Sequence, residues 1–323
     1  MADADNTKSS GRIPVILNPA AKSEGAASLS EQISDFSHQV ELHETTGPDD
    51  ARKFAKSLAL EGRPLIVAAG GDGTVNEVAT GISTAREESN SEINPVLGIL
   101  PTGTMNVFAR ELGIPCNDPL EAWAAIQSGL RVDVDLWMAD DRPFLQMAGV
   151  GLDAEIIRRT TWQSKKMLGP LSYLFTGISL VGRTPPKLRV EIPGREPLHG
   201  CAIVVGNGAL YGGAIPFFPG ASNSDGMLEI LVFRKLDAGV LLQLGGAIAA
   251  HEYCDSDHIV YERADDFTIH SDGPTEEPME VDGELGGETP VHFTHAKYRV
   301  RVARPPDPRP QSLPQIADEH LSS

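Results

Sequence analysis

Cysteine is scarce in this 323-residue sequence, and no apolar run is long. The three cysteines lie far apart without a CxxC pair, which argues against a disulfide framework and a zinc site. The longest apolar stretches, 170–182 and 239–250, are shorter than the ~20 residues that a membrane-spanning helix needs. Residues 1–11 are polar and lack the apolar core of a signal peptide. We therefore expect a cytoplasmic protein, peripheral at a membrane surface at most.

Basic residues are also few, because 27 lysines and arginines face 45 aspartates and glutamates, for a formal net charge of −18. General nucleic-acid binding needs cations that displace phosphate counterions, so it is not expected here. An anionic ligand must be held locally, by backbone N–H groups, a metal or a few placed cations. The one basic cluster is either a solvated helix face or a contact to an anionic membrane; it comprises Arg158, Arg159, Lys165 and Lys166.

Several familiar nucleotide motifs are absent too. No Gly-Lys pair occurs, which excludes a Walker A loop, and neither the HRD nor the DFG motif of protein kinases is present. The stretch 149–154 fits a GxGxxA pattern, but no acidic residue follows about 20 positions later to hold a ribose. A dinucleotide site at that stretch is therefore rejected.

The apolar pattern changes near residue 130. Before that point short apolar strands alternate with helical patterns, which predicts a parallel sheet with helices on its faces. Strands are expected at 13–18, 40–43, 64–69 and 96–100, and helices at 26–36, 49–60 and 74–82.

After residue 130, strand-like runs separated by turn clusters predict antiparallel β structure. Strands are expected at 130–138, 144–148, 188–192, 201–205, 228–233, 267–270 and 297–303, and helices at about 154–181 and 238–253. The expected fold class is a parallel-sheet α/β domain followed by a β-rich, sandwich-like domain. The expected boundaries are a disordered leader at 1–11, the α/β domain at 12–130, the β-rich domain at 131–303 and a disordered tail at 304–323.

The strongest functional signal is Gly70-Gly71-Asp72-Gly73-Thr74, which follows the buried strand at 64–69 and precedes a helix. Three glycines let the backbone approach a ligand closely, and free N–H groups at a helix N-terminus favour a phosphate. Asp72 would repel that phosphate unless it faces a cation or an attacking hydroxyl. A tight turn without a ligand is the alternative, but the flanking strand and helix favour a phosphate site.

The stretch 99–106 repeats this arrangement, because it leaves a buried strand and opens a helix. Thr104 and Asn106 fall near the start of that helix, where they either cap N–H groups or contact a ligand. Both loops follow parallel strands, and ligands of open α/β sheets bind at the carboxyl ends of such strands. We therefore expect the two loops to border one crevice.

Together these residues resemble the diacylglycerol kinase catalytic family, which includes bacterial lipid kinases and, more distantly, sphingosine and ceramide kinases. The resemblance covers about residues 13–303. It rests on motifs in a fixed order: Asn18-Pro19, the stretches 70–74, 100–106 and 149–154, Asn207 with Tyr211-Gly212-Gly213, Asp225-Gly226 and Asp282-Gly283-Glu284. The glycine-rich loop alone would also admit NAD kinases, whereas the later motifs favour the lipid kinases.

The resemblance implies a lipid kinase that uses ATP and Mg²⁺, with a last strand that returns to the first domain. The acceptor it implies is a diacylglycerol-like, sphingoid or polyprenol lipid. ATP is implied to lie on the glycine-rich loop, with Thr45 and Thr104 as further contacts and Asn18 in the same nucleotide site. The implied nucleotide-binding residues are Asn18, Thr45, Gly70, Gly71, Asp72, Gly73, Thr74, Val75, Asn76, Glu77, Gly103, Thr104 and Asn106.

The resemblance also implies a metal site and a proton acceptor. A structural Mg²⁺ is implied at Asp225, beside the carbonyl oxygens of Ser222 and Met227, although this stretch alone is typical of a hairpin turn. Glu284 matches the proposed proton acceptor, and Asp72 is the rival base or a ligand of a magnesium-bound water.

Two features depart from the family pattern, and one is the stretch 20–25 with Lys22, which is looser than the usual small-residue turn after Asn18-Pro19. Many bacterial members have aspartate after the loop asparagine, where this chain has Val107. This departure keeps open a catalytically silent regulator that binds nucleotide or lipid. An NAD kinase-like enzyme with a soluble acceptor is a further alternative, and a homodimer is left open.

Overall fold

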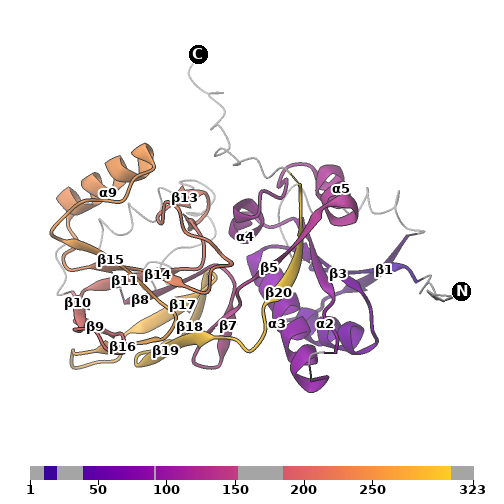
Figure 1. The fold of residues 1–323 in the computed structure, drawn as a ribbon, viewed down its shortest axis with the longest axis horizontal. Coiled ribbons are helices and arrows are strands. Elements are labelled where there is room, and N and C mark those ends of the chain that lie inside the picture. The colour runs from indigo at the N-terminus through magenta and orange to yellow at the C-terminus, as the bar shows by residue number, and fades with distance from the viewer. Residues whose placement is uncertain (1–10, 20–38, 91, 152–184, 307–323) are drawn as a thin grey trace, which may run out of the picture.

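The computed structural model describes residues 11–19, 39–90, 92–151 and 185–306. Within these ranges the chain forms two units that lie side by side (Figure 1). The helices expected at 26–36 and 154–181, and the basic cluster at 158–166, lie outside the described residues. The predicted fold class, a parallel α/β domain followed by a β-rich, sandwich-like domain, is confirmed.

The first unit is built on a six-stranded sheet with the order β2-β1-β3-β4-β20-β5. The first five of these strands run parallel, and β5 pairs with β20 in the antiparallel direction. Because its strands are covered on both faces, β3 is apolar and buried over almost its whole length. The strands are β1 (Ile13–Leu17), β2 (Val40–Glu44), β3 (Leu65–Gly70), β4 (Val96–Pro101), β5 (Leu130–Val134) and β20 (Val300–Arg304).

Helices cover both faces of this sheet. In Figure 1, α2 and α3 lie on one side of the strands and α5 lies on the other. The α5 helix begins where the carboxylate of Asp118 accepts hydrogen bonds from the N–H groups of Leu120 and Glu121. The helices are α2 (Asp50–Leu60), α3 (Asp72–Glu88), α4 (Val107–Glu111) and α5 (Pro119–Ser128).

Two strands from outside the N-terminal run, β5 and the late strand β20, complete the first sheet. In Figure 1 the yellow strand β20 runs among the indigo and magenta strands of the first unit. Arg301 on β20 holds the carboxylate of Asp133 on β5 with two hydrogen bonds of 2.9 and 3.2 Å, which lower the pKa of Asp133. The first sheet therefore takes strands from both sides of the boundary expected at residue 130.

The second unit packs two antiparallel six-stranded sheets face to face. One sheet has the order β10-β9-β16-β19-β6-β7, and the other has the order β15-β14-β11-β8-β17-β18. Mainly aliphatic side chains from both sheets fill the space between them, and on one sheet Phe267 stacks on Phe293 at 4.8 Å. The first of these sheets comprises β6 (Trp137–Ala139), β7 (Arg142–Phe144), β9 (Leu188–Glu191), β10 (Leu198–Gly200), β16 (Phe267–Ser271) and β19 (Val291–His295). The other comprises β8 (Met147–Gly151), β11 (Ala202–Gly206), β14 (Leu228–Phe233), β15 (Ile259–Ala264), β17 (Pro278–Val281) and β18 (Glu284–Glu288).

A third apolar cluster lies on the outer face of the sheet that contains β14. It is covered by α9 (Ala238–Ala250) and by the short ribbon of β12 (Leu210–Tyr211) and β13 (Ile215–Pro216). The α9 helix ends earlier than expected, because His251 takes a left-handed conformation that stops it. Among the described residues, no helix is both long and apolar enough to cross a membrane.

The single strand expected at 130–138 is divided into β5 and β6. Asp135, which is fully buried, lies between them, and its N–H donates to the carbonyl of Asn223 rather than to a neighbouring strand. The chain leaves the first sheet at this residue and enters the second unit. Similarly, the strand expected at 144–148 is divided between β7 and β8.

Candidate active site

A cleft with a volume of about 950 Å³ lies at the carboxyl ends of β1, β2, β3 and β4, where the two units meet. Nine of the residues expected at the nucleotide or base position are among those that line it. The described residues along the cleft are Asn18, Pro19, Thr45, Thr46, Gly47, Pro48, Ala51, Gly71, Gly73, Thr74, Glu77, Gly103, Thr104 and Glu284.

The glycine-rich loop forms one wall of the cleft. Gly71 is the N-cap of α3 and has no side chain, so no side chain caps the N–H groups of the first turn. Gly70 lies just behind, where a Cβ atom would come within 2.4 Å of the Thr74 hydroxyl oxygen. That hydroxyl accepts a hydrogen bond of 3.2 Å from the side-chain amide of Asn18. The loop therefore presents backbone donors at the end of a 17-residue helix, as an anion site requires.

The second loop packs against the first through backbone atoms. A Cβ atom on Gly103 would lie 2.4 Å from the Cα of Gly71, so only glycine fits there. Asn106 takes a left-handed conformation, and its side-chain amide binds both the N–H and the carbonyl of Gly103. Asn106 is buried and lies behind the cleft wall, where it shapes the loop.

The loop before α2 forms a third wall of the cleft. Of its residues, only Thr45 was expected at the site. The carboxylate of Asp50 accepts hydrogen bonds from Thr46 and from the N–H of Gly47, which lowers the pKa of Asp50. The loop directly follows the parallel strand β2, and this location in the sequence could have identified it as part of the site.

Glu77 lines the cleft, but its carboxylate is turned toward α2. It accepts hydrogen bonds of 3.1 Å from the N–H groups of Asp49 and Ala51 at the start of that helix. Glu77 thus closes the N-terminus of α2. Val75 is part of the apolar core and does not line the cleft.

The described residues that line the cleft include no lysine and no arginine. Along this described lining, negative phosphates would therefore meet backbone N–H groups and helix dipoles. This arrangement agrees with the low number of basic residues in the chain.

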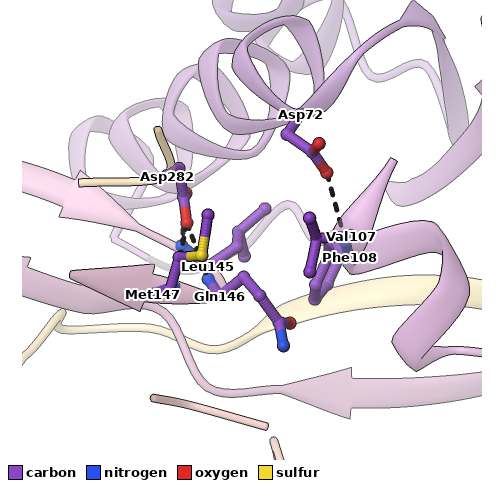
Figure 2. Close-up of a pocket in the computed structure, with 7 residues that line it drawn as sticks. All are labelled: Asp72, Val107, Phe108, Leu145, Gln146, Met147 and Asp282. Atoms are coloured by element: carbon purple, nitrogen blue, oxygen red, sulfur yellow. Dashed lines mark hydrogen bonds between the residues drawn. The ribbon is translucent and has the colours of Figure 1, made fainter. Parts of the chain in front are cut away.

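Asp72 does not line the cleft, although it belongs to the glycine-rich loop. Its carboxylate points toward the start of α4 and accepts a hydrogen bond of 3.1 Å from the N–H of Phe108 (Figure 2). The residue is half-buried, and the enclosure of the carboxylate raises its pKa to about 6, with the nearby charge of Asp282 adding to the effect. Asp72 thus joins the glycine-rich loop to α4.

Asp282 connects several segments of the chain, a role that its sequence motif alone did not indicate. Its two oxygens accept hydrogen bonds from three successive N–H groups, those of Leu145, Gln146 and Met147, at 2.9 to 3.0 Å (Figure 2). The side-chain amide of Asn76 on α3 donates a further bond of 2.6 Å. Burial raises the pKa of Asp282 despite these donors.

Asp282 therefore ties the turn between β17 and β18 to both units of the molecule. A cavity of about 10 Å³ separates Asp282 from Asp72. The side-chain amide of Asn76 serves this connection, and the contact expected between Asn76 and the nucleotide stays a prediction.

Glu284 is placed at the first residue of β18, directly after that turn. A Cβ atom on Gly73 would lie 3.0 Å from Glu284 Oε1, so the carboxylate lies against the glycine-rich loop. The two residues come from different units and are far apart in the sequence. Of the two candidate bases, Glu284 borders the cleft and Asp72 does not.

The residues of the expected metal site lie in the turn before β14, away from the cleft. Asp225 forms an ion pair with Arg263, and its other oxygen accepts a hydrogen bond of 3.1 Å from the N–H of Met227. A cation bound at Asp225 with Ser222 and Met227 would have to displace the Arg263 guanidinium. Across the described part of the chain, no three His, Cys, Asp or Glu side chains form a group that could hold a metal ion. A structural Mg²⁺ in this turn stays a prediction.

Comparisons with known proteins agree with this geometry. Residues 12–139 match the model of the diacylglycerol kinase catalytic domain. Residues 146–304 match the YegS C-terminal NAD kinase beta sandwich-like domain. Residues 12–139 thus belong to the diacylglycerol kinase catalytic family. The chain is therefore a lipid kinase by its catalytic domain, and ATP use follows from that domain.

Individual relatives cover nearly the whole chain. A diacylglycerol kinase from Bacillus subtilis (strain 168) is 28% identical over 302 residues, which are 91% of this chain and 96% of that protein. A diacylglycerol kinase from Staphylococcus carnosus (strain TM300) is 28% identical over 280 residues, or 86% of this chain and 88% of the relative. The crystal structure of a candidate diacylglycerol kinase from Bacillus anthracis (strain Sterne) superposes with a TM-score of 0.76 at 26% identity, covering 95% of this chain and 100% of that one.

Proposed function

We propose that this chain transfers the γ-phosphoryl group of ATP to a lipid hydroxyl group, on diacylglycerol or on a related sphingoid or polyprenol alcohol. The observation that carries the proposal is the position of Glu284, a carboxylate of the β-rich unit that lies against Gly73 of the glycine-rich loop. A carboxylate there would meet an acceptor hydroxyl that approaches a phosphate bound on the loop.

Phosphoryl transfer depends mainly on positioning and on charge stabilisation, and different residues of the cleft would serve these two roles. The N–H groups at the start of α3 would bind the phosphates. Asn18 holds the hydroxyl of Thr74 at the same edge. Glu284 would accept the proton of the attacking hydroxyl.

A magnesium ion that accompanies ATP fits this cleft. The described lining residues offer no side-chain cation to balance the phosphates, whereas the hydroxyl oxygens of Thr45 and Thr104 are hard donors of the kind that Mg²⁺ prefers and leave Glu284 free to act as the base. When bound, Mg²⁺ would neutralise part of the phosphate charge.

The test is a transfer assay from labelled ATP to diacylglycerol, ceramide, sphingosine, polyprenol and NAD, with the Glu284→Gln protein as the matched control. We expect labelled product on one or more of the lipids and its loss in the control. ATP binding without any product would instead indicate a silent regulator. Labelled NADP would indicate an NAD kinase-like enzyme, and either result would overturn the proposal.

A further inference from the structure

A fully buried carboxylate lies beneath the turn that carries Glu284. Glu280 is at a β-bulge in β17 and has no exposed surface. One of its oxygens accepts a hydrogen bond of 2.8 Å from the N–H of Gly283, and the other accepts a bond of 2.9 Å from the hydroxyl of Tyr211. Glu280 thus connects the residue next to Glu284 with the β12–β13 ribbon.

Burial of a carboxylate needs an explanation, because removing a charge from water is costly unless strong hydrogen bonds offset it. An apolar side chain would fill the same position in β17 without that cost. What a carboxylate adds is two acceptor atoms at fixed positions, one for each donor. The residue type therefore indicates that the two bonds matter more than the packing.

The bond to Gly283 holds the turn residue that follows Asp282. Val281 and Glu284 pair across a two-residue turn in which Asp282 and Gly283 both have positive φ angles, of 46° and 86°. The side chain of Asp282 anchors the first turn residue to β8 and to the chain before it. The Glu280 carboxylate anchors the second, directly before Glu284.

At the other end of this connection, Tyr211 is buried and its ring packs on Phe217 at 5.2 Å. The residues before it, Ala209 and Leu210, donate their N–H groups to the carboxylate of Glu111 on α4. That helix begins just after the second cleft loop. The ribbon is therefore fixed to the α/β unit and to the Glu284 turn at once.

We propose that Tyr211 and Glu280 are positioning residues that hold Glu284 against the glycine-rich loop. The inference deepens the proposed function and rests on it for the role of Glu284. An error of about 1 Å in the placement of a reacting group lowers a rate by roughly a hundredfold. Loss of either hydrogen bond should therefore lower kcat and leave the distant ATP contacts intact.

The test compares four variants: Glu280→Leu, Glu280→Gln, Tyr211→Phe and, as the matched control, Tyr253→Phe. Leucine removes both acceptors. Glutamine keeps both bonds, because its oxygen accepts from Gly283 and its NH₂ group donates to the Tyr211 hydroxyl, which also accepts. Tyr253 is 46% exposed and lies outside the cleft, so its change removes a hydroxyl without touching the turn.

We expect Glu280→Leu to lower kcat by roughly 10- to 100-fold with an unchanged KM for ATP. Tyr211→Phe should lower kcat by a smaller factor, whereas Glu280→Gln and Tyr253→Phe should keep near-normal turnover. Hydrogen exchange of the amides at 282–286 should be faster in Glu280→Leu and Tyr211→Phe than in the other two proteins. This second measurement needs no substrate and is made on the folded fraction of each variant.

Normal kcat in both Tyr211→Phe and Glu280→Leu, or unchanged amide exchange in both, would overturn the inference. A lower melting temperature with normal kcat would reduce Glu280 to a structural residue, which also overturns it. A wild-type protein that phosphorylates no lipid would overturn the proposed function instead. In that case faster exchange in the two variants would still support the positioning of the turn.

Discussion

The glycine-rich loop and the β17–β18 turn face each other across the cleft, yet their backbones are held by different means. In the loop, Gly70 makes room for the side chain of Thr74 and Gly71 for the backbone of Gly103, and the N–H groups at the helix start carry no side-chain cap. In the turn, Asp282 and Glu280 supply carboxylates that take up backbone N–H groups. The loop side thus offers uncapped backbone N–H groups to a ligand. On the turn side, backbone N–H groups bind the Asp282 and Glu280 carboxylates, which fix the turn that carries Glu284.

This difference predicts how each side responds to mutation. The loop tolerates few added atoms, whereas the turn depends on particular acceptor oxygens. The expected effects below are ordered from the largest to the smallest.

The largest effect is expected for Glu284→Gln, which removes the proton acceptor but keeps the size of the side chain. We expect kcat to fall by about 10²–10⁴-fold while ATP affinity stays nearly normal. Single-turnover kinetics and ATP titration of the same protein measure the two quantities. Near-normal turnover would move the base to Asp72 and leave Glu284 as a turn residue.

Gly103→Ala examines the loop side of the comparison. The added Cβ would lie 2.4 Å from the Cα of Gly71, so the two loops must separate. We expect a loss of roughly 1–3 kcal/mol in the free energy of unfolding, together with weaker ATP binding. Denaturant unfolding and ATP titration check both effects. The control is Gly47→Ala on the third wall, where an added Cβ meets no atom within 4 Å.

Asp72 belongs to the loop but lines a small cavity together with Asp282 of the turn, so Asp72→Asn sharpens the comparison through pH. A carboxyl whose pKa is about 6 in the folded protein and 3.8 in the unfolded chain binds its proton more tightly when folded. Its stabilising contribution is therefore complete below pH 4 and is lost as the pH rises through 6.

Asparagine does not ionise, so the Asp72→Asn protein should keep this stability as the pH rises and be more stable than the wild type at pH 7, by about 3 kcal/mol. It should also bind ATP with Mg²⁺ less well and turn over more slowly. Melting temperatures between pH 4 and 7 measure the first effect. Parallel curves for the two proteins across that range would contradict it.

The smallest effect is expected for Asp225→Ala, which lies outside both sides of the cleft. Loss of its exposed ion pair with Arg263 should cost about 1 kcal/mol or less and leave ATP affinity unchanged. If the turn holds a structural Mg²⁺, magnesium alone will raise the melting temperature of the wild type and not that of the variant. Loss of ATP affinity with unchanged stability would contradict both parts.

The sequence predicted the loop side of the cleft far better than the turn side. The glycine-rich loop is contiguous, and the strand and helix that define it lie within a few residues of Gly71. By contrast, the N–H groups that Asp282 binds come from residues 135 to 137 positions earlier in the chain. No local pattern contains that partnership.

The roles of individual residues were harder to predict than their location. Asn76, Glu77 and Asn106 were expected to contact the nucleotide, because each lies in a motif that borders the site. In the structure, the side chain of Asn76 binds Asp282, that of Glu77 binds the start of α2, and that of Asn106 binds Gly103. Sequence spacing places a side chain near a ligand, but the competing backbone groups around it become visible only after the chain has folded.

The position of β20 has a consequence for how the protein is made. A ribosome synthesises the chain from its N-terminus, so β4 and β5 emerge long before residues 300–304, the strand that must lie between them. At ~5–20 residues per second, the nascent α/β unit waits on the order of ten seconds or more with an open gap in its sheet. The backbone N–H and C=O groups along that gap stay unpaired during the delay, and separate expression of residues 12–139 would leave them unpaired permanently.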